Sequence, residues 1–338
     1  MSDKYLNKLE EISESIGNTK LYAIDFKLHG EKRRVYSKCE CGNFTGSAKD
    51  RMAINILKEA YRKGEIAEGY HIVEATSGNT GIALAAIGKE LGHRVTIFMP
   101  DWLSVERQEL IRGYGAEIIL VSREEGGFMG SIERAKELAE KEPNSFLANQ
   151  FSNKDNMLSH YRATGPEIYE QIMEHEENID AFVAGVGTGG VVMGVGNYLR
   201  EKNPAVKIHP LEPGNSPTLS TGHKVGAHRI EGISDEFIPS ILELDFLDDV
   251  ISVDDGDAIC MAQKLERDLG LEIGISSGAN FLGAVLAQDM ISNDAVVATI
   301  FTDDNKKYKS TDLNRVEQIK CDFISSDIEL LGVAKIEF

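Results

Sequence analysis

The chain has 338 residues, of which 42% are hydrophobic and 27% charged, and its 55 acidic and 36 basic residues give a formal net charge of −19. So acidic a surface repels phosphate groups, which argues against nucleic acid and anionic membranes as partners. No apolar run approaches the roughly 18 residues of a membrane-spanning helix, and the charged first residues do not resemble a signal peptide, so we expect a cytoplasmic protein.

Apolar strand-like runs alternate with amphipathic helical segments along most of the chain. Strands are expected at residues 35–40, 71–76, 94–100, 116–121, 145–150, 181–187, 206–213 and 295–303. Helices are expected at residues 53–64, 79–92, 104–115, 131–142 and 166–177. This alternation predicts an α/β protein with mostly parallel sheets and right-handed crossovers. So many strands suit two α/β units with a cleft between them better than one twisted sheet. The residues after about 311 are expected to wrap around the domain or to pair at the edge of a sheet.

The first segment that suggests chemistry is TGSAKDR, at residues 45–51, just before a strongly periodic helix. Ser47 is a candidate N-cap and Asp50 completes a capping box, so the helix is expected to begin here. Lys49 then lies in the first turn, where the helix dipole disfavours a cation. Shortly before it, Cys39 and Cys41 point to one face of a strand; with no histidine or further cysteine nearby, we interpret them as two half-buried thiols.

Two glycine-rich turns that leave strands are candidate anion sites, because ligands bind at the carboxyl ends of strands in open α/β sheets. The turn TSGNTG, at residues 76–81, has more small and polar residues than capping alone requires, which favours binding of a carboxylate or phosphate by helix-start amides. The turn GVGTGG, at residues 185–190, matches the dinucleotide fingerprint, and Glu212 follows after another strand. This match leaves an NAD-dependent oxidoreductase open as an alternative, although the glycines by themselves predict only a phosphate cradle.

A third turn, GISSGAN at residues 274–280, supplies hydroxyl groups at the start of another helix. One of Ser276 and Ser277 is expected to cap that helix, and the other to bond a ring nitrogen or similar ligand atom. A nicotinamide dinucleotide would use only the second turn. A compact ligand with one phosphate and one ring, together with a carboxylated substrate, would use all three turns and Lys49.

The chain resembles the cysteine synthase and cystathionine β-synthase family of fold-type II enzymes that use pyridoxal 5′-phosphate (PLP). The resemblance covers residues 15–311 and rests on many motifs in the same order, among them IGNT, GSAKDR, EATSGNTGIALA, FVAGVGTGG, EGISDEFIP and GISSGA. It implies a two-domain fold of the tryptophan synthase β type. We accordingly expect a smaller α/β domain at 43–155, a larger one formed by 15–42 and 156–311, and a C-terminal tail at 312–338.

Read residue by residue, the resemblance implies that Lys49 forms the Schiff base with PLP and acts as base at Cα. A neutral amine is needed for this, and the helix start should lower the pKa of Lys49. Asn79 would face the ring hydroxyl and Ser276 the pyridine nitrogen, while the 5′-phosphate would be bound by Gly187, Thr188, Gly189 and Gly190. The substrate carboxylate would be held by Thr76, Ser77, Asn79, Thr80 and Gln150.

Several positions depart from the common pattern of this family. Phe44 and Thr45 stand where a proline and a glycine are usual, and Val191 replaces a threonine of the phosphate loop. The segment TDDNKKYKST has Asp303, Asp304 and Lys306 in place of a glycine-containing turn. The loop EGISDEFIP has Ser234, Asp235 and Glu236 where cysteine synthases have small neutral residues. Either both of its acids point to solvent, or one faces the site as a base for a water or thiol, and Asp235 is then our first choice.

The implied reaction is β-replacement on a small amino acid through an aminoacrylate, most simply O-acetyl-L-serine plus sulfide giving L-cysteine and acetate. The alternative uses L-cysteine or L-serine as donor, as in a cysteine hydroxyl-lyase or a lanthionine or cystathionine β-synthase, with Asp235 activating the nucleophile. A third interpretation is a non-catalytic relative that binds an amino acid or a partner protein, and the retention of Lys49, Asn79 and Ser276 together argues against it. The resemblance also implies a homodimer, and no metal is expected.

Overall fold

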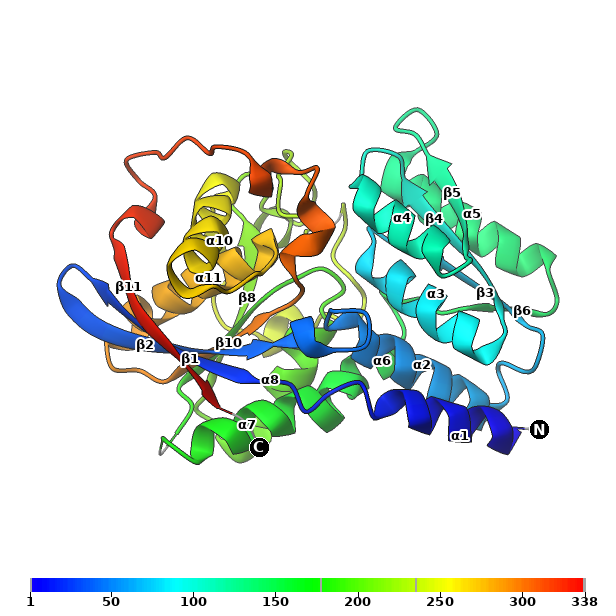
Figure 1. The fold of residues 1–338 in the computed structure, drawn as a ribbon, viewed down its shortest axis with the longest axis horizontal. Helices are drawn as coiled ribbons and strands as arrows, with labels where there is room; N and C mark the ends of the chain where they lie inside the picture. Colours follow the sequence, from blue (N-terminus) through cyan, green and yellow to red (C-terminus); the bar gives the residue numbers. More distant parts are fainter. Residues whose placement is uncertain (1, 177, 235, 337–338) are drawn as a thin grey trace.

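The fold is given by a computed structural model that describes residues 2–176, 178–234 and 236–336. Figure 1 shows two bodies side by side, a larger one on the left and a smaller one on the right, each built around its own β-sheet. In the part of the chain so described, no helix is both long and apolar enough to cross a membrane. The described residues also contain no cluster of three or more potential metal ligands.

The smaller sheet has four strands in the order β5-β4-β3-β6, and every pair in it is parallel. The central strand β3 is buried along its whole length, as expected for a parallel sheet with helices on both faces. Helix α5 packs on one face and helices α3 and α4 on the other. The strands are β3 (His71–Ala75), β4 (Arg94–Pro100), β5 (Glu117–Val121) and β6 (Ser145–Leu147). The helices of this body are α2 (Lys49–Lys63), α3 (Asn79–Leu91), α4 (Val105–Gly113) and α5 (Gly127–Lys141), with α1 (Ser2–Ser13) packed on α2.

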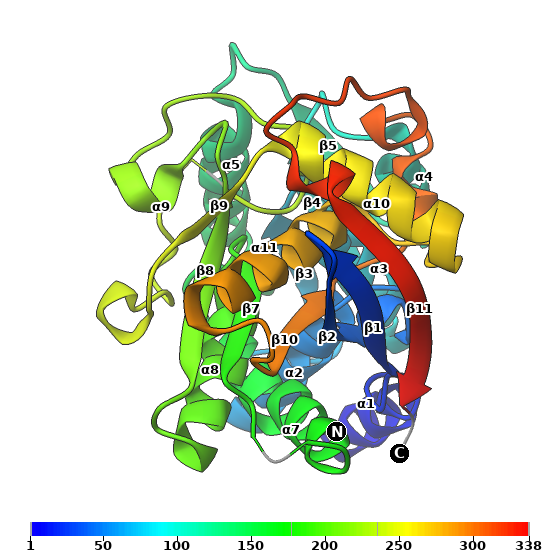
Figure 2. The same ribbon diagram turned by 90° about the vertical axis from the view of Figure 1, so that its left-hand side faces the viewer.

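The larger sheet has seven strands in the order β11-β1-β2-β10-β7-β8-β9. The first three pair antiparallel and the others parallel. Figures 1 and 2 show helices α10 and α11 over one face of this sheet and helices α7 and α8 over the other. The strands are β1 (Leu21–Leu28), β2 (Glu31–Cys39), β7 (Ala181–Gly185), β8 (Lys207–Pro213), β9 (Ile251–Val253), β10 (Val297–Phe301) and β11 (Ile328–Ile336). The helices are α6 (Lys154–Ser159), α7 (Gly165–Met173), α8 (Gly190–Lys202), α9 (Thr218–Thr221), α10 (Asp255–Leu269) and α11 (Ile275–Ile291).

The prediction of an α/β protein with mostly parallel sheets is confirmed. The end of the chain pairs at a sheet edge as β11, which is hydrogen-bonded to β1. The domain boundaries at 43 and 155 stay a prediction. Two local expectations were wrong: the N-cap of α2 is Ala48 rather than Ser47, and no side chain caps α11, whose N-cap is Gly274.

A buried ion cluster fastens the start of α2 to the larger body. Arg51, two residues after Lys49, donates to Glu167 on α7 at 2.6 and 2.7 Å, and to Glu40 in the turn after β2 at 2.8 Å. Lys38 on β2 pairs with Glu167 at 2.7 Å. Burial opposes the ionisation of Glu167, but its bonds to Arg51 and the charge of Lys38 prevail and lower its pKa to about 2. The cluster therefore fixes the helix that carries the candidate lysine relative to the larger sheet.

Candidate active site

Strands of both sheets end at one pocket, whose empty space is about 670 Å³ when its open mouth is included. Its wall is formed by the turns after β3 and β7, the start of α2 and the starts of α3 and α11. Eight of the residues proposed from the sequence lie together in this wall: Lys49, Thr76, Ser77, Asn79, Thr80, Gln150, Thr188 and Ser276. Gly187 lies there too, whereas Gly189 and Gly190 form the start of α8 behind it.

Lys49 is the first residue of α2, and the end of β10 fixes its position. The amide of Ala48 donates to the carbonyl of Thr302 at 2.9 Å, and Ser47 forms a β-bridge with Asp303. The pKa of His160 lies well below its usual range. The larger cause is burial of the imidazole, and the second is the positive charge of Lys49. A neutral imidazole therefore lies near the lysine. The expected low pKa of Lys49 itself stays a prediction.

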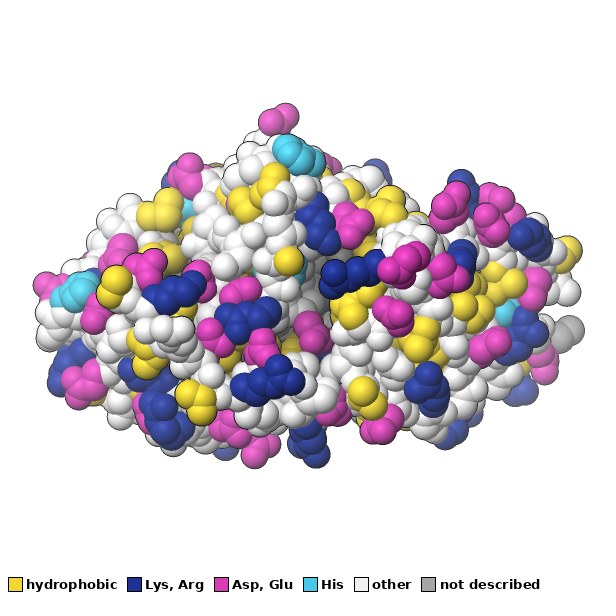
Figure 3. All heavy atoms as spheres, turned by 90° about the horizontal axis from the view of Figure 1, so that it is seen from above, with side chains coloured by type: hydrophobic (Ala, Val, Ile, Leu, Met, Phe, Trp, Pro, Cys, Tyr) yellow, Lys and Arg dark blue, Asp and Glu magenta, His cyan; other side chains and the backbone are white. Residues whose placement is uncertain are grey.

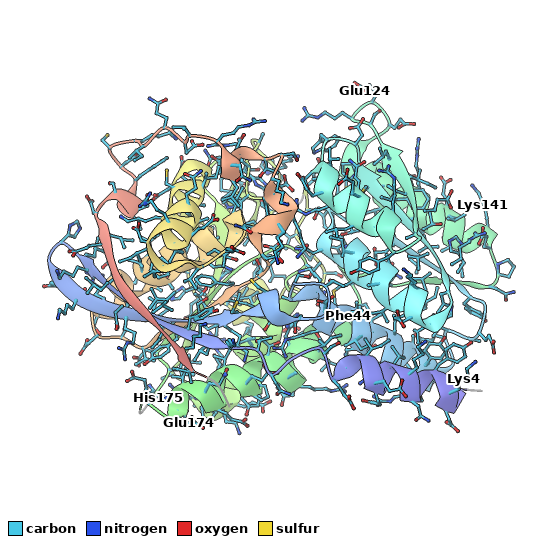
Figure 4. The ribbon with its side chains drawn as sticks, in the orientation of Figure 1. Lys4, Phe44, Glu124, Lys141, Glu174 and His175 are labelled. Atoms are coloured by element: carbon cyan, nitrogen blue, oxygen red, sulfur yellow. The ribbon has the colours of Figure 1, made fainter. Side chains whose placement is uncertain are left out.

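The loop before Lys49 is closed by Asp50. Its carboxylate accepts from the amide of Thr45 at 2.8 Å and from the Thr45 hydroxyl at 2.5 Å. Burial raises the pKa of Asp50 to about 6. Thr45, which replaces a residue usual in the family, thus supplies a hydroxyl that hydrogen-bonds to Asp50 in the first turn of α2. Phe44, the neighbouring departure, is 37% exposed and lies between the two bodies in Figure 4.

The turn after β3 brings its backbone close to a buried arginine. Gly78 has a φ of 145°, and a Cβ there would lie 2.1 Å from Cδ of Arg107 on α4. Only glycine fits at this place. Thr76 accepts from the Gly78 amide at 3.0 Å, so this hydroxyl shapes the turn in addition to lining the pocket.

Thr80 and Gln150, both proposed to hold a carboxylate, are bonded to each other. The Thr80 hydroxyl donates to Gln150 Oε1 at 2.6 Å, and Gln150 Nε2 donates to the carbonyl of Ala75 at 2.7 Å. The two side chains are thereby held in position at the pocket wall. The free backbone amides at the start of α3 remain the strongest anion-binding feature of this turn.

The turn after β7 is packed so closely that its glycines have no room for side chains. A Cβ on Gly187 would lie 2.4 Å from the carbonyl of Gly232, and one on Gly190 would lie 2.0 Å from Asn156 Oδ1. Asn156 also donates to Thr188 Oγ1 at 2.9 Å. Gly189, with a φ of 84°, is the N-cap of the 13-residue helix α8. The start of α8 therefore presents amides and a hydroxyl to the pocket, as a phosphate site requires.

Ser276 lies at the opposite wall, with its hydroxyl 2.6 Å from Thr302 Oγ1. Its neighbour Ser277 accepts from the Thr302 amide at 2.9 Å and is fully buried. The structure therefore separates the two serines: Ser277 holds the end of β10, and Ser276 faces the pocket beside Thr302. Sequence reasoning missed Thr302, since only the fold brings the end of β10 to the start of α11.

Arg107 is a further pocket residue that sequence reasoning missed. It is 2% exposed, pairs with Glu231 across the pocket, and lies over the ring of Tyr308 at 4.5 Å. Tyr308 donates to Asp303 at 2.9 Å. Burial, and next the charge of Asp303, raises the pKa of Tyr308, so the phenol keeps its proton. The one signal in the sequence was Gly78, which leaves room for the arginine.

Asn79 has one side-chain atom engaged and one available. Its Nδ2 donates to Asp303 Oδ2 at 2.8 Å. Its Oδ1 is buried and accepts no hydrogen bond from any residue that the structure describes. A buried acceptor without a partner is costly, so a donor group on a ligand in this pocket is the expected partner.

Asp235 lies outside the described residues, but its two neighbours are placed. Ser234 has a φ of 55°, and its amide donates to the carbonyl of Val186 at 2.8 Å. Glu236 pairs with Lys224 at 2.8 Å, at the rim of a cleft that opens from the pocket between the two bodies. Figure 3 shows this hollow, with basic and acidic side chains on both sides of it. Of the two candidate carboxylates in this loop, Glu236 is thus accounted for by a surface ion pair.

Comparison with known proteins agrees with this geometry. The family described as "Pyridoxal-phosphate dependent enzyme" matches residues 12–303. The probable cysteine synthase of Bacillus subtilis is 41% identical over 89% of this chain and 96% of its own length, and cysteine synthase B of Campylobacter jejuni is 42% identical over 90% and 98%.

Two crystal structures of a hydrogen sulfide-producing enzyme of Fusobacterium nucleatum are similar over nearly the whole chain. Both are 56% identical and cover 98% of this chain, with TM-scores of 0.94 and 0.95 and coverage of 99% and 100% of their own chains. One of the two is an aspartate-to-asparagine variant in complex with an alpha-aminoacrylate intermediate.

Proposed function

The chain belongs to the family of pyridoxal-phosphate dependent enzymes, and on that premise we propose that it catalyses β-replacement on a small amino acid of the serine or cysteine type. The resemblance inferred from the sequence is thereby confirmed, and so is PLP as cofactor. The alternative of a dinucleotide-dependent oxidoreductase, left open by the turn at 185–190, is not supported by this match. The observation that carries the proposal is the meeting of Lys49 and two helix N-termini in one pocket.

The residues present fit the cofactor. The start of α8, with glycines that cannot carry a Cβ, suits the 5′-phosphate, and the unpartnered Oδ1 of Asn79 suits the ring hydroxyl. We assign Ser276, a neutral hydroxyl in the pocket wall, to the ring nitrogen. We assign the substrate carboxylate to the start of α3, with Thr76 and Ser77 at that turn.

When bound, PLP supplies the electron sink that stabilises negative charge at the substrate Cα. The protein's part is to place the reacting groups. Lys49 would hold the cofactor and would move a proton at the substrate Cα. Arg107 and Glu231 close one side of the pocket as an ion pair, which restricts the entry of water.

Two amino acids remain as candidates for the substrate that loses its β-substituent, and a different relative supports each of them. Relatives named cysteine synthase, at 41% and 42% identity, favour O-acetyl-L-serine with sulfide as nucleophile. The sulfide-producing enzyme of F. nucleatum, at 56% identity, favours L-cysteine as donor with release of sulfide. Because the second similarity is greater and extends over nearly the full length of both chains, we infer that release of sulfide is the reaction to test first.

For that reaction we propose Asp235 as the base that activates the incoming water or thiol. Its neighbours Ser234 and Glu236 are bonded to Val186, which follows β7, and to Lys224, and both line the cleft that opens from the pocket. A reaction intermediate held by an aspartate-to-asparagine variant of the F. nucleatum enzyme is consistent with a carboxylate acting after the leaving group has departed. We also propose, from the family resemblance, that the enzyme is a cytoplasmic homodimer.

The test is a matrix of donors and nucleophiles with identified products. L-cysteine, L-serine and O-acetyl-L-serine are each supplied with water, sulfide or a thiol, and sulfide and amino-acid products are quantified. We expect rapid steady-state release of sulfide from L-cysteine. This rate should fall at least about tenfold in Asp235→Asn, because each further turnover waits for the incoming nucleophile that Asp235 activates. Glu236→Gln is the matched control and keeps the wild-type rate. Turnover of O-acetyl-L-serine with sulfide alone would instead establish cysteine synthase activity and remove the role of Asp235.

A further inference from the structure

Thr302 is a pocket residue that the proposed function leaves without a role. It begins the segment at 302–311 that departs from the family pattern, and it lies in the pocket wall beside Ser276. The two hydroxyl oxygens are 2.6 Å apart, so one of them donates a hydrogen bond to the other. Each hydroxyl has only one proton, so the direction of this bond decides which of the two is left to donate to a ligand.

We propose that Thr302 is a positioning residue: its hydroxyl donates to Ser276 Oγ and thereby leaves the Ser276 proton for the ring nitrogen of bound PLP. This inference rests on the proposed binding of PLP in this pocket. It goes beyond the assignment of Ser276 to the ring, because it identifies the residue that directs the serine and states which way the hydrogen bonds run.

Backbone hydrogen bonds hold Thr302 between two helices that begin at the pocket. Its carbonyl accepts from the amide of Ala48, directly before Lys49, at 2.9 Å. Its amide donates to Ser277 Oγ, next to Ser276, at 2.9 Å. A threonine side chain is branched at Cβ, which limits its rotamers. The Thr302 hydroxyl is therefore kept beside Ser276 by bonds within the protein.

The surroundings of Ser276 favour a ring nitrogen without a proton. Ser276 is the second residue of the 17-residue helix α11, whose amino end carries partial positive charge. Among the pocket-lining residues that the structure describes, Glu231 is the one carboxylate, and it pairs with Arg107. Asp303, after the end of β10, is buried and accepts from Asn79 at 2.8 Å. A pyridinium would thus lie beside a helix start with no carboxylate left to pair with it, so the neutral nitrogen, which only accepts, is favoured.

The direction of the bond follows from this acceptor. A neutral ring nitrogen needs a donor, and a serine that gives its proton to Thr302 has none left for the ring. When Ser276 donates to the ring, its oxygen is free to accept, and the Thr302 hydroxyl at 2.6 Å is within reach as the donor. Hydrogen bonds in such a chain polarise one another, so the bond from Thr302 also makes Ser276 a better donor. Loss of the Thr302 hydroxyl therefore weakens the bond to the ring nitrogen although Ser276 itself remains.

The experiment compares the affinity of the apoprotein for PLP with its affinity for an analogue in which a C–H group replaces the ring nitrogen, both by fluorescence titration. The wild type should bind PLP more tightly than the analogue. Thr302→Val keeps the shape of the side chain and removes the hydroxyl. We expect it to weaken binding of PLP about fivefold, the size of one net hydrogen bond, and to leave binding of the analogue unchanged.

Two matched variants serve as controls. Thr302→Ser keeps a hydroxyl and is expected to keep the wild-type ratio of the two affinities. Thr299→Val makes the same substitution on the same strand, where the hydroxyl donates to the carbonyl of Val183 at 2.8 Å and is not part of the pocket wall. It too should keep the wild-type ratio.

A double variant shows whether Thr302 acts through Ser276. Ser276→Ala is expected to weaken binding of PLP and not of the analogue. If Thr302 acts through the serine, adding Thr302→Val to Ser276→Ala changes the ratio of affinities no further. A second drop of about fivefold in the double variant would mean that Thr302 contacts the cofactor itself, and would overturn the inference.

An unchanged ratio in Thr302→Val would also overturn the inference, and so would an equal loss of affinity for both ligands, which is the result of a merely structural role. Thr302→Ala, with the same expected ratio, covers the case in which Thr302→Val does not fold. Wild-type protein that binds the two ligands equally would overturn the inference without any variant and would leave the proposed function standing. Apoprotein that binds neither ligand, with no label on Lys49 after borohydride, would overturn the proposed function and this inference with it.

Discussion

Glu74 on β3 allows a quantitative test of the structure, since it is a buried carboxylate directly below the turn that carries Thr76. It is 3% exposed, and it accepts from the amides of Ala75 at 2.8 Å and Gln150 at 3.2 Å. Burial nevertheless outweighs these bonds and raises the pKa of Glu74 to about 7 from its usual 4.5. The folded protein therefore holds a proton at Glu74 that the unfolded chain has lost.

The sign and size of the effect follow from this difference. Between pH 4.5 and about 7 the folded state binds more protons at Glu74 than the unfolded state, so the free energy of unfolding falls as the pH rises through this window. At about 1.36 kcal/mol per pH unit, the loss reaches about 3 kcal/mol above the window. Glu74→Gln has no proton to lose and removes this dependence.

The assay is urea unfolding of the wild type and Glu74→Gln at a series of pH values. The free energy of unfolding of the variant minus that of the wild type is expected to rise by about 3 kcal/mol between about pH 4 and pH 8. Other titrating groups, such as Asp50 and Glu167, are present in both proteins and cancel in the difference. Glu109→Gln, at an exposed position of α4, is the control. Its free energy of unfolding should differ from that of the wild type by the same amount at every pH. A difference for Glu74→Gln that is flat or falls with pH would refute the argument.

Two further predictions test the parts that position the lysine and the cofactor. Arg51→Met leaves the carboxylates of Glu40 and Glu167 buried without their main cation, so the free energy of unfolding should fall by about 3–5 kcal/mol in urea titrations, and an unchanged midpoint would contradict the role of the cluster. Gly187→Ala places a Cβ 2.4 Å from the carbonyl of Gly232, so the affinity for PLP, measured by fluorescence titration of the apoprotein, should fall about tenfold or more. Equal affinity in the two proteins would mean that the turn is not the phosphate cradle.

Long periodic elements and glycine-rich turns could be predicted from the sequence because their signals are local. Strand β4 was predicted with the observed bounds, and α3 and β8 to within one residue. Strands β1 and β9 were not predicted, and the segment of β11 was expected only to wrap or pair at an edge. Strand β11 depends on β1 about 300 residues earlier, and β9 depends on β8, whereas β1 pairs both with β11 and with β2 directly after it. Their register is a property of the folded sheet rather than of the local pattern.

The same distinction holds in the active site. Lys49, Asn79 and the turn before α8 belong to local motifs that mark a helix start, and in the structure they line one pocket, while their roles stay a prediction. Arg107 and Thr302 were missed as site residues, because their positions follow from how α4, the end of β10 and the start of α11 meet in space. The N-cap at Ser47 was wrong, since Ser47 forms a β-bridge with Asp303 and Ala48 precedes the helix instead.

The most direct test of the central claim is reduction of the purified, cofactor-loaded protein with borohydride, followed by mass spectrometry of its peptides. Formation of an imine with a lysine is the step from which all the proposed chemistry proceeds. The account predicts a reduced pyridoxyl phosphate group on Lys49, and a Lys49→Ala protein that carries no such group and does not turn over L-cysteine or O-acetyl-L-serine. A label on another lysine, or full turnover by Lys49→Ala, would contradict the account.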